Sequence, residues 1–203
     1  MENKRRVVLV FPDSGPLISL SVGGHLDLLL RLNIPVFIVD EVFHECTRDL
    51  SKPGALAVRD FVFQNPDKVR IGQTFVGEMA ERVRKEGGSP GRGLGEAAIA
   101  EFFADIDRLI DSKDPVLIVF EDNDIHRINA VVRGNVHLLS TWGLLKGMER
   151  VGIIGSAEDV WRDISRNGRN PQRAFVDQES PGVYGGSRWP PEDRKAPSSE
   201  PEA

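Results

Sequence analysis

The sequence predicts an α/β domain with a mostly parallel central sheet. Short apolar runs rich in β-branched residues alternate along the chain with longer amphipathic stretches. Strands that alternate with helices favour parallel pairing, because each helix returns the chain to the end of the sheet where the last strand began. At 203 residues the chain is long enough for one domain and an extension. Ligands of such sheets gather at the carboxyl ends of the strands, where we expect a functional site.

The first half of the chain begins with a continuous apolar run at residues 7–11, which Pro12 ends and which predicts a buried strand. Pro16 suits a first helical turn, and leucines then recur at helical spacing to residue 32, with Gly23-Gly24 a weak point inside. The other elements expected here are strands at 35–39 and, weakly, 69–76, and helices at 41–48, 55–63 and 77–85.

The second half opens with a glycine-rich loop at residues 87–93. A strong helix follows from Gly95, because apolar residues recur at intervals of three and four as far as Ile110. Further strands are expected at 116–120 and 136–139, and helices at 122–132, 141–148 and 157–164. The folded domain should span residues 1–166. The Gly-, Pro- and Arg-rich extension 167–203 should be largely disordered, since it contains almost no apolar residue after Trp189.

Composition excludes several classes of protein. Cys46 is the only cysteine, so an intrachain disulfide and a cysteine-rich metal site are ruled out, and a reducing compartment is favoured. The N-terminal apolar run has five residues, too few for a signal peptide. No stretch approaches the roughly 18 apolar residues that a membrane span needs. We therefore expect a soluble cytoplasmic protein that does not enter a membrane.

The net charge of −5 is unusual for a nucleic-acid-binding protein. Two features reduce this objection. Acids at a metal site are neutralised by the cation, and the basic residues are clustered within 82–93 and 162–173. Solvated helix faces remain the simpler explanation of each basic cluster taken alone.

Four acidic residues occupy positions where a charge is costly. Asp13 and Asp122 each stand two residues beyond a predicted strand, at its carboxyl end. Glu96 falls on the core-facing stripe of its helix, and Glu45 on the apolar side of its helix beside Cys46. Carboxylates that converge at one sheet edge repel one another, which indicates a divalent cation. Ligands that are all oxygen favour Mg²⁺ or Mn²⁺ over Zn²⁺.

Each acid also has a structural explanation. Asp13 and Asp122 could cap the helices that follow them, Glu96 could interact with its helix dipole, and Glu45 could lie at the surface. Their joint placement favours a site.

Five motifs follow one another along the chain: DSGPLISL at 13–20, VDEVFHE at 39–45, GLGEAAI at 93–99, EDND at 121–124 and LSTWGLL at 139–145. In this order they resemble the motifs of PIN-domain nucleases, in particular the subgroup of VapC-like toxins. The resemblance spans residues 7–164. Two departures concern Phe120, where many relatives have Thr or Ser, and His126-Arg127, which replaces Ala-Arg. They leave the acids intact and affect the expected substrate contacts.

The resemblance implies a PIN-like three-layer fold and a Mg²⁺- or Mn²⁺-dependent endoribonuclease. Its catalytic and metal-binding acids would be Asp13, Glu45, Glu96 and Asp122, with Asp124 as a possible fifth ligand. Ser14 and Thr141 would be polar neighbours that contact the substrate, and Arg92 in the glycine-rich loop would contact the RNA backbone. The role implied is the toxin of a toxin–antitoxin pair, with a small antitoxin as partner and possible homodimerisation.

Three other functions are alternatives to a metal-dependent ribonuclease. A binding or regulatory protein with the same fold but no activity would be expected to have lost acids, whereas all four are present. A DNA nuclease cannot be distinguished from a ribonuclease by these residues. A receiver-like phosphoacceptor domain needs a lysine near the end of a late strand, and residues 136–141 contain none.

Overall fold

The computed structural model describes residues 7–121 and 135–171. Its centre is a five-stranded sheet in the order β3-β2-β1-β4-β5, in which every pair is parallel. The strands are β1 (Leu9–Pro12), β2 (Val36–Val39), β3 (Val69–Gly72), β4 (Val116–Phe120) and β5 (Val136–Ser140). The predicted α/β class is confirmed, and the arrangement is consistent with a PIN-like three-layer fold.

The central strands are apolar on both faces because helices cover both faces. All four residues of β1 and all five of β4 are buried. The two strands pair in register from Leu9 opposite Val116 to Pro12 opposite Val119. Continuous apolar strands of this kind are typical of doubly covered parallel sheets.

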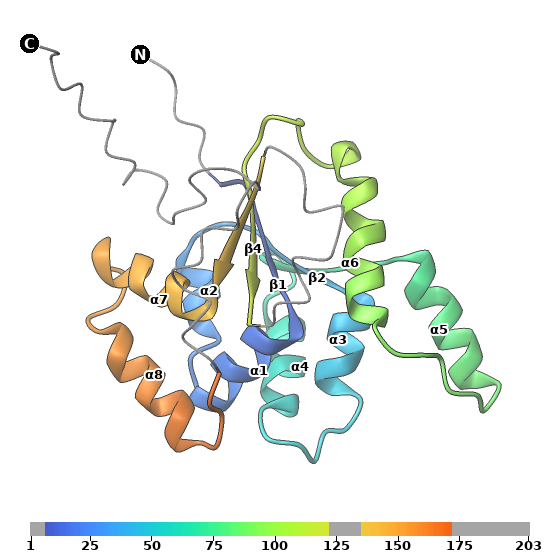
Figure 1. Cartoon of the computed structure of the whole chain (residues 1–203), viewed down its shortest axis with the longest axis horizontal. Coiled ribbons are helices and arrows are strands. Elements are labelled where there is room, and N and C mark those ends of the chain that lie inside the picture. The colour runs from blue at the N-terminus through green and yellow to red at the C-terminus, as the bar shows by residue number, and fades with distance from the viewer. Residues whose placement is uncertain (1–6, 122–134, 172–203) are drawn as a thin grey trace, which may run out of the picture.

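Helices flank the sheet (Figure 1). Helices α7 and α8 lie beyond the β5 edge in this view, and α5 and α6 lie at the opposite side. The helices are α1 (Ser14–Gly23), α2 (Asp27–Arg31), α3 (Asp40–Thr47), α4 (Ala55–Gln64), α5 (Phe75–Lys85), α6 (Leu94–Ala104), α7 (Thr141–Arg150) and α8 (Ala157–Arg166).

Three elements differ from the sequence prediction. The single helix expected at 16–32 is two helices, because Gly24 adopts the left-handed conformation (φ 76°) that ends α1. Strand β3 ends at Gly72 rather than at residue 76, since Thr74 caps α5 there. Helix α6 ends at Ala104, and a short 3₁₀ turn, Ile106–Arg108, replaces its expected last turn.

Other predictions lie outside the described residues. These are the helix at 122–132 and most of the expected extension, of which only residues 167–171 are described. Within the described ranges, no helix is long and apolar enough to span a bilayer.

Candidate active site

Asp13 stands where β1 ends and α1 begins. Its backbone N–H donates to the carbonyl of Val119 on β4 at 2.9 Å, which fixes it at the carboxyl edge of the sheet. It occupies the N-cap position of α1 with an extended backbone, but its side chain makes no capping hydrogen bond. The capping explanation of Asp13 therefore lacks the bond on which it depends.

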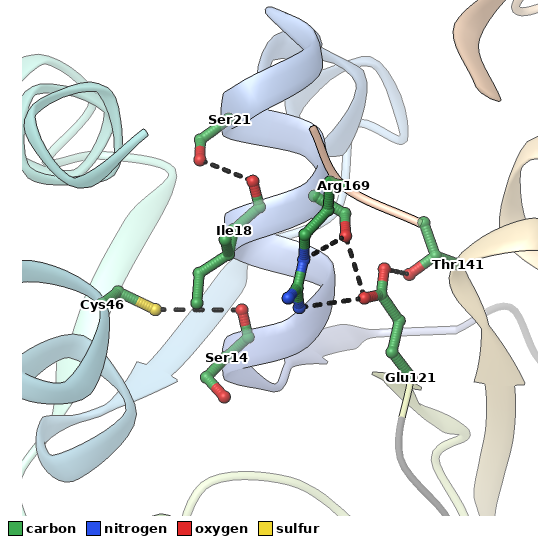
Figure 2. A network of polar contacts seen from close by, with 8 residues as sticks. Ser14, Ile18, Ser21, Cys46, Glu121, Thr141 and Arg169 are labelled. Carbon is green, nitrogen blue, oxygen red and sulfur yellow. Dashed lines mark hydrogen bonds and ion pairs between the residues drawn. The ribbon is translucent and has the colours of Figure 1, made fainter. Parts of the chain in front are cut away.

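Cys46 shows that acidic groups from α1 and α3 approach one another. Its thiol lies 3.9 Å from the carbonyl oxygen of Ser14, the residue next to Asp13 (Figure 2). Burial, and after it the charges of Glu45 and Asp13, raise the pKa of Cys46 to about 12. Two carboxylates on different elements thus act on one buried thiol, which is therefore inert and not a nucleophile.

The prediction that Glu45 faces the core is wrong, because the residue is exposed. Its carboxylate turns instead toward the first turn of α6: Oε2 lies 3.5 Å from where a Cβ on Gly95 would stand. Glu96, the next residue on α6, is half-buried, and its Oε2 lies 3.6 Å from the corresponding point on Gly93. Glu45 and Glu96 therefore border a common space between α3 and α6.

That space is a pocket of about 330 Å³. Its walls come from α3, from the end of α5 with the following loop, and from the start of α6. The ionisable side chains that line it are three acids, three arginines and one histidine: Glu41, Glu45, Glu96, Arg48, Arg84, Arg92 and His44. Burial and the neighbouring charge of Arg84 lower the pKa of His44, so His44 is neutral at neutral pH.

A network of hydrogen bonds holds the walls of this pocket together. The carboxylate of Asp40, at the start of α3, accepts from the backbone N–H and the hydroxyl of Thr74, both at 2.8 Å. Glu101 of α6 accepts from the backbone N–H groups of Phe75 and Val76 at the start of α5. Asp40 and Glu101 thus connect α3 and α6 to the N-terminus of α5, where backbone N–H groups have no partner within the helix.

Glu41 and Arg84 form a buried ion pair at the base of the pocket. The side chain of Glu41 is 5% exposed and receives two hydrogen bonds from the guanidinium, one of them at 2.9 Å. This bidentate bond raises the pKa of Arg84. Each charge satisfies the other, so neither is available to a ligand.

Glu121, which was not among the predicted site residues, lies at the centre of a second polar cluster. It directly follows β4, and its side chain is 8% exposed. The carboxylate accepts from the hydroxyls of Ser19 at 2.8 Å and Thr141 at 2.7 Å, and lies 3.4 Å from the guanidinium of Arg169 (Figure 2). Burial raises the pKa of Glu121, while these donors act in the opposite direction.

A close approach of the backbone makes room for this carboxylate. A Cβ on Gly15 would lie 2.9 Å from the Cβ of Glu121, which is closer than side chains allow. The glycine two residues after Asp13 thus lets α1 pack against the end of β4. The EDND motif contains the sequence signal for Glu121, although its position directly after a strand favours Asp122 equally well.

The remaining predicted site residues differ in their surroundings. Ser14 is half-buried at the start of α1, beside Asp13. Arg92 is exposed and lines the pocket. Thr141 is fully buried, and its hydroxyl is bonded to Glu121, so it orients this carboxylate and offers no surface to a substrate. Asp122 and Asp124 lie outside the described residues.

The donor set suits a hard cation, but the described acids do not complete a site for one. Asp13, Glu45 and Glu96 offer only carboxylate oxygens, the ligands that Mg²⁺ and Mn²⁺ prefer. Within residues 7–121 and 135–171, no three His, Cys, Asp or Glu side chains are close enough together to hold a metal ion. The predicted metal-binding set includes Asp122 and Asp124, so the described acids are only part of it.

Comparison of the chain with protein-family models, with curated proteins and with solved structures finds no match.

Proposed function

We propose that the protein is a metal-dependent endoribonuclease whose acidic residues are Asp13, Glu45, Glu96 and Asp122. The observation that supports it best is the placement of the first three. Asp13 lies at the carboxyl edge of the sheet, Glu45 and Glu96 border one pocket, and both Asp13 and Glu45 act on the thiol of Cys46. The motifs that resemble PIN-domain nucleases support the same assignment.

The proposed reaction is hydrolysis of an RNA phosphodiester bond by water. When bound, Mg²⁺ or Mn²⁺ supplies a water of lowered pKa and positive charge for the phosphate oxygens. Asp13 and the neighbouring acids hold that charge at the sheet edge. Asp13 follows a buried strand, which is a rigid mount, whereas Glu45 and Glu96 extend from helices. No side chain serves as a covalent nucleophile in this scheme, in agreement with the raised pKa of Cys46.

The first test is cleavage of single-stranded RNA by the purified full-length chain with Mn²⁺ or Mg²⁺. Cleavage should stop in EDTA, and Asp13→Asn and Asp122→Asn should each abolish it. Asp27→Asn is the matched control, because Asp27 is exposed on α2 and pairs with Arg31 away from the acids. A single-stranded DNA of the same sequence, run in parallel, separates a ribonuclease from a DNA nuclease.

Equal cleavage by all three variants would identify a contaminating nuclease and remove the proposal. Absence of cleavage by the wild type on any substrate, with the variants equally inactive, would favour a binding protein of the same fold.

The biological role that we propose is the toxin of a cytoplasmic toxin–antitoxin pair. This role depends on the resemblance alone, as do the small antitoxin and the homodimer that it implies. A short neighbouring gene whose product blocks the cleavage is the observation that tests it.

A further inference from the structure

The pocket between α3 and α6 contains charges that its own ion pairs do not use. Glu41 and Arg84 neutralise each other at its base. This leaves Glu45 and Glu96 on the acidic side and Arg48 and Arg92 on the basic side. Both arginines are exposed, and neither forms an ion pair with any residue in the described part of the chain. The pocket therefore presents two available guanidinium groups beside two carboxylates.

The two guanidinium groups suit a phosphodiester anion. A guanidinium binds phosphate oxygens through paired N–H donors. Arg92 belongs to a loop of glycines and Ser89, where backbone N–H groups can approach a ligand closely.

We propose that this pocket binds a backbone phosphate of single-stranded RNA through Arg48 and Arg92, next to the phosphate that is cut. The inference rests on the proposed function and deepens it: Glu45 and Glu96 line the same pocket, and the two arginines hold the phosphate beside the one that is cleaved. The effect of Glu45 and Glu96 on phosphate binding depends on whether a cation is bound. Without a cation they repel the phosphate. With their charge offset, the two arginines dominate the pocket.

The test is binding without cleavage. A short fluorescein-labelled single-stranded RNA is titrated with the full chain in EDTA, and fluorescence anisotropy is followed over a range of salt concentrations. Arg48→Gln and Arg92→Gln should each weaken binding and lower the slope of log affinity against log salt by about 0.7, the value for one phosphate contact on a single strand. Arg82→Gln is the control, because Arg82 lies on α5 outside the pocket and pairs with Glu78.

Glu45→Gln should have the opposite effect in EDTA and tighten binding. A general loss of positive charge does not predict this sign, and neither does misfolding. Equal weakening by Arg82→Gln, or unchanged binding in both pocket variants, would overturn the proposal. The comparison with a single-stranded DNA of the same sequence is a further check. If the arginine variants weakened binding to RNA but not to this DNA, the proposal would also be overturned, because both nucleic acids carry the same phosphate.

The outcome is separable from that of the nuclease assay. RNA binding that depends on Arg48 and Arg92, without any cleavage, would support the phosphate-binding pocket and contradict the nuclease proposal. Metal-dependent cleavage with binding unaffected by Arg48 and Arg92 would do the reverse.

Discussion

A single buried carboxylate, that of Glu121, connects the parts of the chain that surround the sheet edge. Its donors come from α1, from the start of α7 and from the segment after α8. Ser19 lies 102 positions away in the sequence, so periodicity could not have revealed the contact. The sequence offered Asp13, Glu45 and Glu96 as candidates, because position relative to a strand or a helix is a local property, but it put Glu45 on the wrong side of its helix. The hydrogen-bond partners of a buried group depend on the packing of distant segments.

The burial of Glu121 should make the free energy of unfolding depend on pH. Because its pKa is raised in the folded state, its contribution is fully present below the unfolded pKa near 4.5 and is lost as pH rises through the folded pKa. Glu121→Gln keeps an acceptor and removes the charge. The free energy of unfolding of wild type minus that of Glu121→Gln should therefore fall as pH rises above about 4.5. Urea unfolding of both proteins at several pH values measures this difference.

A difference independent of pH would mean that Glu121 is solvated in the folded protein. Glu121→Ala supplies the contrast. It leaves the hydroxyls of Ser19 and Thr141 without their acceptor, so it should be about 1–3 kcal/mol less stable than Glu121→Gln at every pH.

At the scale of elements, hydrophobic periodicity located the helices well and their faces less well. Helix α3 has eight residues, only a little more than two turns. Each residue rotates the face by about 100°, so a small error in the expected orientation moved Glu45 from the exposed to the apolar side. Strand β4 was predicted with its correct bounds, because a fully apolar run between turns has no such ambiguity.

The contact of α1 with the end of β4 gives an element-scale prediction. Gly15→Ala places a methyl group 2.9 Å from the Cβ of Glu121, so α1 or the end of β4 has to shift. Overpacking of this kind should cost about 1–3 kcal/mol, measured by urea unfolding. Gly155→Ala is the control, because no atom lies within 4 Å of its added Cβ. Equal stability of the two variants would show that the contact between α1 and Glu121 is loose.

At the scale of the whole molecule, the alternation of strands and helices predicted the parallel sheet. It did not predict which side chains from distant segments meet around that sheet. The position of Glu45 beside the first turn of α6 depends on the packing of α3 and α6, which strand β3 and helices α4 and α5 separate in the chain. Likewise, Arg169 was assigned to the extension, yet it contacts Ser19 and Glu121. Long-range contacts of this type follow from the assembled core and not from any local pattern.

The assembled set of acids makes a prediction for the whole fold that needs no substrate. Neighbouring carboxylates repel one another, more weakly where solvent screens them, and unfolding relieves that repulsion. Asp13→Asn and Glu45→Gln should therefore be at least as stable as wild type in EDTA. The structure favours this result, because Asp13 makes no capping bond and Glu45 is exposed.

Excess Mn²⁺ should then stabilise wild type and affect the variants much less. A ligand at about 100 times its Kd adds about 2.7 kcal/mol, which for a domain of this size raises Tm by roughly 5–10 °C. Thermal melting of the three proteins, each in EDTA and in Mn²⁺, gives six curves that separate the two explanations of the acids. Acids that serve as caps or ion-pair partners would give variants less stable than wild type in EDTA. If the variants were less stable than wild type in EDTA and Mn²⁺ left the Tm of wild type unchanged, the metal site and the nuclease proposal would both be eliminated.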